Sequence, residues 1–247
     1  MPPPAVVVVA DAHLGADSAA EPDFIAFLAR VPSLGSHLVI NGDLFDFWFE
    51  YRSVIPRAAF PVLAALRRLR DAGTALTITG GNHDRWGGTF FERELGASFY
   101  PEGAELMLAG WRTWLVHGDG LSEQHWGGRV LHWATRTRLT VGLFRAIHPD
   151  LGFWIARRMS RTVAEGTRDP KALERAAAAQ SVFARQRLGA RADLDLIVLA
   201  HTHRPRLEAV SSRRWYLNPG SWMDDRAYAI ITPDGPALHR FSDHPAS

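Results

Sequence analysis

The chain has 247 residues, of which 47% are hydrophobic, and its formal net charge is +2 at pH 7. This length accommodates one large α/β domain with an inserted subdomain, and the apolar content is sufficient for a real core. The chain has no cysteine, which excludes disulfides and thiolate–zinc sites. Any bound metal must therefore be held by His, Asp, Asn or Glu, which suit manganese, iron, zinc or cobalt.

The charge is unevenly distributed, although its small sum gives no reason to expect a nucleic-acid partner. Between Arg129 and Arg168 there are eight arginines against two acidic residues, a local balance of +6. Such a block favours a phosphate-bearing substrate or an anionic membrane, and a solvated helix face is the alternative. No run reaches the roughly 18 apolar residues of a membrane span. We expect a cytoplasmic protein. Peripheral contact with the inner membrane surface stays open, and the sequence does not indicate an oligomeric state.

The predicted elements alternate between strand and helix over most of the chain. Amphipathic patterns predict helices over 22–30, 58–72 and 89–95, and a hairpin is expected around Ala109-Gly110. Apolar runs predict strands over 6–10, 38–40, 76–79, 111–116, 196–200, 206–210, 214–217, 228–232 and 237–240.

The region from 121 to 191 has a different character, helical and rich in Arg, Trp and Leu. We interpret it as a helical insertion, or cap, over a core made of residues 1–120 and 192–247. Residues 170–188 within it predict a long helix. The segment 44–51 is unusually aromatic for a loop, and it fits either a hydrophobic plug under the site or the wall of a binding cleft.

Five of the apolar runs are followed within three residues by Asp, Asn or His, at the strand ends where α/β folds place ligands. Asp11 and His13 are two residues apart, and on an extended segment their side chains would point the same way. His201 and His203 repeat this spacing. Seven candidate ligands are too many for one ion and suit two ions that share a carboxylate, the usual device for hydrolysing phosphate esters. They are Asp11, His13, Asp43, Asn82, His117, His201 and His203.

The motifs Asp11-x-His13, Gly42-Asp43, Gly81-Asn82-His83-Asp84, His117 and His201-x-His203 resemble, in order, those of the calcineurin-like metallophosphoesterases. The resemblance implies a four-layered α/β/β/α sandwich and two divalent metal ions, with manganese favoured. It implies that His83 protonates or stabilises the leaving oxygen and that Asp84 orients His83. Asp11, His13, Asp43 and His203 would hold one ion, and Asp43, Asn82, His117 and His201 the other, with Asp43 bridging.

Within this superfamily the chain resembles more closely the UDP-2,3-diacylglucosamine hydrolases of lipid A synthesis. The segment 42–48, the chain length and a helical insertion after 117–120 carry this resemblance. It implies cleavage of UDP-2,3-diacylglucosamine to UMP and 2,3-diacylglucosamine 1-phosphate, by attack of a metal-bridging hydroxide on phosphorus. One departure is His83, where some members of this group have arginine. Another, smaller one is Ala200, where many superfamily members have glycine.

On this interpretation the cap binds the substrate, and Asn82 also contacts it. Arg157, Arg158 and Arg161 are the candidate phosphate ligands. The alternative for the aromatic residues of the cap is plain packing against the core. The candidate lining of an acyl groove is Trp126, Leu131, Trp133, Phe144, Phe153 and Trp154.

Two other functions remain as alternatives. The first is a phosphodiesterase or phosphomonoesterase with a soluble, nucleotide-like substrate, for which an apolar cap has no use. The second is a scaffold that keeps the fold and has lost the metals. All seven candidate ligands and His83 are present, which argues against the scaffold.

Overall fold

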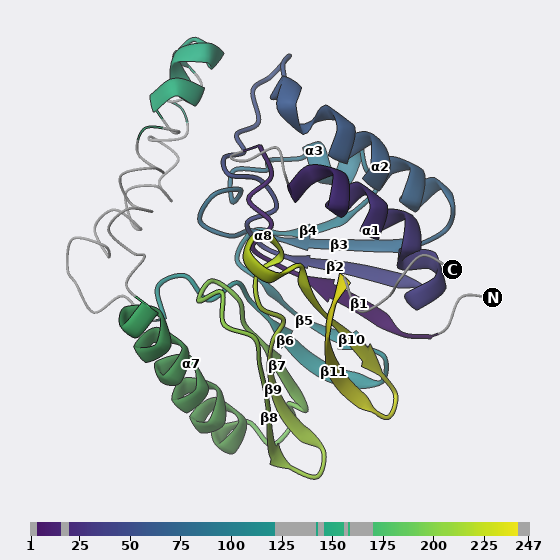
Figure 1. Cartoon of the computed structure of the whole chain (residues 1–247), viewed down its shortest axis with the longest axis vertical. Helices are drawn as coiled ribbons and strands as arrows, with labels where there is room; N and C mark the ends of the chain where they lie inside the picture. Colours follow the sequence, from purple (N-terminus) through teal and green to yellow (C-terminus); the bar gives the residue numbers. More distant parts are fainter. Residues whose placement is uncertain are drawn as a thin grey trace.

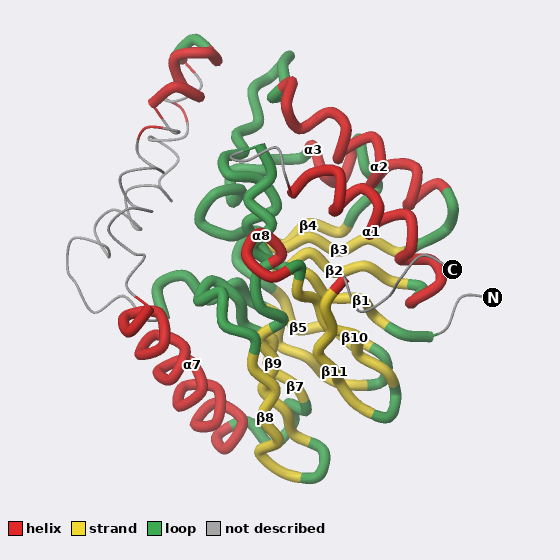
Figure 2. Tube along the Cα trace, in the orientation of Figure 1, coloured by secondary structure: helices red, strands yellow, loops and turns green. Residues whose placement is uncertain are grey.

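The computed structural model describes residues 4–15, 20–121, 142, 146–155, 158 and 170–241. They form two β-sheets packed face to face, with helices on the outer side of each sheet (Figures 1 and 2). The layers therefore follow in the order helix, sheet, sheet, helix. This arrangement confirms the predicted four-layered α/β/β/α sandwich.

The first sheet has six strands in the order β11-β10-β1-β2-β3-β4. Its strands β1 to β4 pair in parallel, so that their carboxyl ends meet at one edge. β1 consists of four buried valines, which suits a strand covered on both faces. The bounds are β1 Val6–Val9, β2 His37–Asn41, β3 Ala75–Thr79, β4 Ser98–Tyr100, β10 Ala227–Thr232 and β11 Gly235–Arg240.

The second sheet has five strands in the order β5-β6-β7-β9-β8. β6, β7 and β9 are parallel, while β5 and β8 close the two edges as antiparallel strands. The predicted hairpin is confirmed, because Ala109 and Gly110 both have positive φ between β5 and β6. The bounds are β5 Ala104–Leu108, β6 Trp111–Leu115, β7 Leu196–Val198, β8 Arg206–Ser211 and β9 Arg214–Asn218.

Apolar side chains from both sheets form the layer between them. Val8 and Val39 of the first sheet meet Leu115 and Val198 of the second, and all four are fully buried. Each of these residues lies two to four positions before a candidate ligand. The layer therefore sets how the two sets of strand ends face each other.

Helices α1 and α2 cover the first sheet, and α7 covers the second. The sequence assigns α7 to the insertion, yet Ala184 and Leu188 of this helix pack against Ile197 and Tyr216 of the second sheet. α7 is thus the outer layer of the sandwich, and we place the boundary of the insertion before it. The bounds are α1 Ala20–Leu34, η1 Arg57–Ala59, α2 Phe60–Asp71, α3 Phe90–Arg93, α7 Pro170–Ala190 and α8 Trp222–Asp225.

Most of the remaining insertion lies outside the described residues, including Arg157, Arg161, Trp126, Leu131, Trp133 and Phe144. A described helix over 149–155 contacts the core through Phe153, whose ring centroid is 5.6 Å from that of Phe47. Trp154 of this helix is exposed. Among the described helices, none combines the length and apolar character needed to cross a membrane.

The aromatic segment 44–51 matches both expectations for it. Phe45 and Trp48 are buried and stacked, with centroids 5.2 Å apart, and form a plug against α3 through Phe91. Phe47 is half-buried and packs edge-on against Phe153, and both rings line a small pocket. The segment is therefore a plug on one side and a pocket wall on the other.

Candidate metal centre

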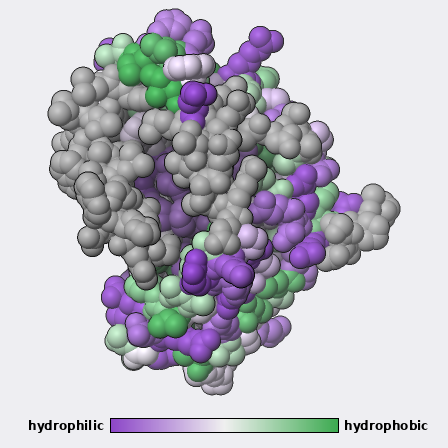
Figure 3. Space-filling view, turned by 60° about the vertical axis from the view of Figure 1, so that its left-hand side comes forward, coloured by the Kyte–Doolittle hydropathy of each residue, from purple (hydrophilic) through white to green (hydrophobic). Residues whose placement is uncertain are grey.

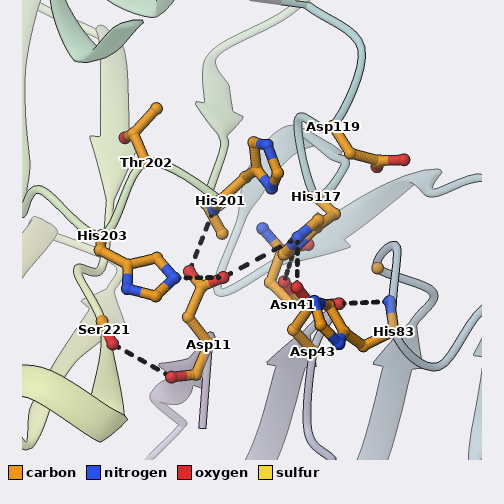
Figure 4. A network of polar contacts seen from close by, with 12 residues as sticks. Asp11, Asn41, Asp43, His83, His117, Asp119, His201, Thr202, His203 and Ser221 are labelled. Carbon is orange, nitrogen blue, oxygen red and sulfur yellow. Dashed lines mark hydrogen bonds and ion pairs between the residues drawn. The ribbon is translucent and has the colours of Figure 1, made fainter. Parts of the chain in front are cut away.

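The candidate ligands gather where strands of both sheets end, as Figure 4 shows. β1, β2 and β3 deliver them from the first sheet, and β6 and β7 from the second. The residues so placed are Asp11, His13, Asp43, Asn82, His83, His117, His201 and His203.

The first group of ligand atoms comes from Asp11, His13 and His203, and these atoms lie within 4.8 Å of one another. His203 Nε2 is 3.5 Å from Asp11 Oδ1, and the rings of His13 and His203 have centroids 5.4 Å apart. The other oxygen of Asp11, Oδ2, accepts a hydrogen bond of 3.0 Å from the backbone N–H of His201. The Asp11 carboxylate is therefore held with its other oxygen, Oδ1, turned toward the imidazole of His203.

The second group comes from Asp43, His117 and His201, again within 4.8 Å. His117 Nε2 is 3.2 Å from Asp43 Oδ2, and the rings of His117 and His201 have centroids 5.3 Å apart. Asp43 Oδ1 accepts a hydrogen bond of 2.9 Å from the backbone N–H of His83. As with Asp11, one oxygen is anchored to the backbone and the other is available.

The two groups of ligand atoms are adjacent. His13 Nε2 lies 3.8 Å from Asp43 Oδ2, and His117 Nε2 lies 3.8 Å from Asp11 Oδ1. One Asp43 oxygen thus faces imidazoles of both groups. This is the position that a carboxylate shared by two ions requires.

The ionisation states favour cation binding. Burial lowers the pKa of His13 to about 3 and that of His201 to about 4, so both rings are neutral ligands at neutral pH. Burial disfavours a charged Asp43, but His117 and His83 hold the pKa of this carboxyl well below its ordinary value. Burial likewise opposes a charged His117, yet Asp43 and Asp11 raise its pKa well above 6.5. Asp43 therefore favours positive charge beside it, whereas burial raises the pKa of Asp11 despite the opposing charges of His203 and His117.

Among the described residues, Asp11 Oδ1 and His117 Nε2 are buried polar atoms that make no hydrogen bond of good geometry, although His117 Nε2 lies 3.2 Å from Asp43 Oδ2. Unpaired buried polar atoms are costly and call for an explanation. Both atoms belong to the ligand groups above, and a divalent cation would satisfy them. The donor set of carboxylate oxygens and imidazole nitrogens fits such an ion.

The tautomer of His117 is set by its surroundings. Its Nδ1 donates to the backbone carbonyl of Asn41 over 2.9 Å, which leaves Nε2 as the ligand atom. The Asn41 side chain donates to the carbonyl of Val116 and accepts from the Thr79 hydroxyl, so it ties the two sheets together. Asn41 is a supporting residue that the sequence analysis does not identify.

The backbone at the site is unusual. Asp11, His13, Asp43, His201 and His203 have φ between 44° and 71°, and the other non-glycine residues of this kind among those described are Ala109 and Arg226. A non-glycine residue costs about 1–3 kcal/mol in such a conformation, and these residues cluster at functional sites. The extended backbone expected for Asp11-x-His13 and His201-x-His203 was wrong, although their side chains do converge.

Asp84 and His83 have partners other than those expected. The buried Asp84 carboxylate accepts backbone hydrogen bonds from Asp43, Leu44 and Gly81, with lengths of 3.2, 2.7 and 2.8 Å. Burial, followed by the charge of Asp43, raises the pKa of Asp84 to about 6, which still leaves it ionised at neutral pH. Asp84 therefore organises the loop that presents Asp43, and its role in orienting His83 stays a prediction.

The ring of His83 is held by Asp46. Its Nδ1 donates to the Asp46 backbone carbonyl over 2.5 Å, and its centroid lies 4.8 Å from that of His13. Burial opposes a charged His83, but Asp43 and the Asp46 carbonyl raise its pKa above 6.5. A protonated ring at the edge of the metal groups can give a proton to a leaving oxygen.

The other predicted site residues are less enclosed. Asn82 follows Gly81 on the loop after β3, and its side chain is exposed, so its role as a ligand stays a prediction. Arg158 is exposed on the described part of the insertion.

A buried ion pair that the sequence analysis does not identify joins two of the ligand loops. Arg85 Nη2 lies 2.6 Å from Asp119 Oδ2, and Arg85 Nη1 donates to the Pro101 carbonyl over 3.0 Å. Burial opposes ionisation of Asp119, but His117 and Arg85 lower its pKa. The pair connects the loop after β3 with the loop after β6.

Gly81 provides a test of the geometry, because a Cβ there would overlap the Asp43 carboxylate and lie 2.7 Å from the Asp43 backbone nitrogen. We expect Gly81→Ala to displace Asp43 and to lower kcat by about 100-fold, the cost of a shift of about 1 Å at a reacting centre. Gly189→Ala is the matched control, since a Cβ at Gly189 has no atom within 4 Å. Equal activity of both variants would show that this loop tolerates movement.

Removal of metal should lower the melting temperature, because bound ions stabilise only the folded chain. At a free-ion concentration of about 100 times Kd one ion contributes about 2.7 kcal/mol. For a chain of this size we expect a loss of about 5–10 °C after chelation. Differential scanning calorimetry with chelator, and again after addition of manganese, measures the loss and its recovery. Identical melting in both states would contradict the metal site.

These features define a class of protein. It is an α/β sandwich in which the strand ends carry a polar centre suited to two cations. The family model for calcineurin-like phosphoesterases matches residues 4–205. The chain therefore belongs to the calcineurin-like phosphoesterases, a dimetal-dependent family of hydrolases.

Curated relatives are similar over nearly the whole chain. The UDP-2,3-diacylglucosamine hydrolase of Porphyromonas gingivalis is 27% identical over 246 residues, which cover 91% of this chain and 93% of the relative. The Escherichia coli protein of the same name is 26% identical over 243 residues, covering 96% and 99%. A solved structure of the E. coli phosphoesterase YfcE covers 98% of this chain and 95% of its own, with 16% identity and a TM-score of 0.47.

Proposed function

We propose that this phosphoesterase cleaves UDP-2,3-diacylglucosamine to UMP and 2,3-diacylglucosamine 1-phosphate. The observation that carries the proposal is a small pocket beside the candidate metal centre, lined mainly by apolar residues. Phe45, Phe47 and Phe153 line it, together with Leu14 and Asp46. Leu14 follows the candidate ligand His13, and Asp46 holds His83. A substrate with a pyrophosphate and fatty acyl chains needs polar and apolar surfaces side by side in this way. The names of the relatives support the same substrate.

The residues of the site have distinct roles in this reaction. When bound, two divalent ions supply a nucleophilic water and neutralise charge on the phosphoryl oxygens. Asp11, His13, Asp43 and His203 would hold one ion, and Asp43, Asn82, His117 and His201 the other. Manganese is the metal that we propose.

His83 acts on the leaving group. Its Nδ1–H is bound to the Asp46 carbonyl, so its Nε2–H is the proton that passes to the departing oxygen. Asp84 keeps the loop of Asp43 in place through backbone hydrogen bonds.

Residues 121–169 form a cap over this site in our proposal. The described contact between Phe153 and Phe47 brings the insertion to the pocket beside the metal centre. Arg157, Arg158 and Arg161 follow this contact in sequence and would bind the phosphates as charge-assisted donors. The acyl chains would lie along the aromatic pocket.

The same end of the molecule would meet the membrane that supplies a lipid substrate. Phe60 and Trp154 are 65% and 63% exposed. The N-terminal end of α2 and helix 149–155 both lie at the top in Figure 1, where Figure 3 shows hydrophobic residues gathered. Trp154→Ser should lower the fraction of protein that sediments with anionic vesicles. Met107→Ser is the control, because Met107 is as exposed as Phe60, at 65%, and its replacement should leave sedimentation unchanged. Equal sedimentation of all three proteins would contradict membrane contact.

The substrate is tested by hydrolysis assays with manganese on three compounds. These are UDP-2,3-diacylglucosamine, UDP-N-acetylglucosamine and a generic aryl phosphodiester. Fast release of UMP from the diacylated compound alone is expected. Activity on the aryl ester alone would keep the metal chemistry and favour the alternative, a phosphodiesterase with a soluble substrate.

A further inference from the structure

The ring of His203 lies between two carboxylates. Its Nε2 faces Asp11 Oδ1 at 3.5 Å, within the first ligand group. Its Nδ1, on the opposite edge of the ring, lies 2.7 Å from Asp224 Oδ2. Asp224 is outside both ligand groups and comes 21 residues after His203 in sequence.

Asp224 is held firmly by the short helix α8. The Ser221 hydroxyl caps this helix by accepting the backbone N–H of Asp224 over 3.2 Å. The same hydroxyl donates to the Asp11 carbonyl, and the Met223 N–H donates to that carbonyl as well. Buried Trp222 anchors the helix in the core. The end of β1 that carries Asp11 and the helix that carries Asp224 are therefore one connected unit.

We propose that Asp224 is a positioning residue for the metal centre. It accepts the Nδ1–H of His203 and so fixes the tautomer whose Nε2 lone pair points at the first ligand group. A carboxylate in this place orients a metal-binding imidazole and increases its basicity. His117 uses the Asn41 backbone carbonyl for the same purpose in the second group, so the two groups are supported by acceptors of different charge.

The inference concerns the metal site and rests on the proposed ligand role of His203, not on the lipid substrate. It predicts an effect confined to one of two ions, because His203 belongs to the first group and His117 to the second. Loss of such an outer partner lowers metal affinity by about 10–100-fold. Asp224→Ala should therefore weaken one of the two binding events and leave the other unchanged.

Isothermal titration of the metal-free full chain with Mn²⁺, in competition with a chelator, measures both events. The variants are Asp224→Ala and Asp224→Asn, the latter of which keeps an acceptor oxygen without its charge and should lose less affinity. The control is Asp225→Ala on the same helix, since Asp225 pairs with Arg240 at 3.6 Å rather than with a candidate ligand. Wild-type affinity at both sites in Asp224→Ala, or equal losses in the two alanine variants, would overturn the proposal.

A second measurement separates positioning from a general loss of structure. In the metal-free protein in alkaline buffer, ¹⁵N–¹H correlation spectra report which ring nitrogen of His203 carries the proton. Wild type and Asp225→Ala should show the Nδ1–H form, and Asp224→Ala a mixture with Nε2–H. An unchanged Nδ1–H form in Asp224→Ala would overturn the proposal. Absence of metal binding by the wild-type protein would contradict the metal site itself. If the wild-type protein binds metal but does not cleave the diacylated substrate, only the proposed substrate is contradicted and the role of Asp224 still stands.

Discussion

Replacement of Asp43 by alanine is expected to abolish turnover while the chain still folds. One oxygen of this buried carboxylate faces imidazoles from both ligand groups, so its loss removes the shared ligand. We expect the rate to fall by at least about a thousandfold, which corresponds to about 4 kcal/mol of transition-state stabilisation. Steady-state kinetics and the metal content of the purified protein measure the two effects.

Two further variants give this prediction its controls. Asp43→Asn keeps the shape of the side chain and should also lose activity, since the shared ligand needs its charge. Asp71→Ala removes an exposed carboxylate of α2, paired with Arg67, and should behave as wild type. Turnover of Asp43→Ala within tenfold of wild type would contradict the shared-ligand arrangement.

Replacement of His83 by alanine is expected to separate catalysis from metal binding. The ring is outside the two groups assigned to the ions, although it forms a third cluster with His13 and Asp46, and its Nδ1 is bound to the Asp46 carbonyl. A general acid contributes about 10²–10⁴-fold to rate, so kcat should fall by that amount while two equivalents of metal remain bound.

The pH dependence of His83→Ala adds a second criterion. Asp43 and the Asp46 carbonyl raise the pKa of His83 against the effect of burial, so the active acid form is lost as pH rises through that pKa. The alkaline fall in wild-type kcat should disappear in His83→Ala. His239→Ala, at a ring stacked on Tyr228 in the first sheet, is the control. Loss of bound metal in His83→Ala would show instead that His83 is a ligand.

The sequence predicts the fold well where hydrophobic runs and motifs coincide. The strands that precede Asp11, Asp43 and His117 are identified because each is an apolar run that ends in a polar residue. The short elements β4 and α8 are missed, since three or four residues carry too little periodicity. α7 is identified as a helix but assigned to the insertion, because only its packing on the second sheet shows that it belongs to the core.

The sequence predicts which residues gather at the site, but not which residues hold them in place. Asn41 and Asp224 orient His117 and His203, yet they lie 76 and 21 residues away from them in sequence. The backbone of Asp11 and His13 is left-handed where an extended one was expected, a conformation that is uncommon for residues other than glycine, although aspartate and histidine adopt it more often than most. Local pattern identifies the candidate ligands, and long-range packing determines how each is held.

The apolar layer between the two sheets has a consequence for the evolution and engineering of this protein. One half of the donor set is attached to the first sheet and the other half to the second, so this layer is the spacer that defines their separation. Interiors are packed too tightly to absorb a change of even one methylene. We therefore expect substitutions at Val39 or Leu115, which contain no reacting atom, to alter the distance between the two parts of the donor set and with it metal affinity and rate.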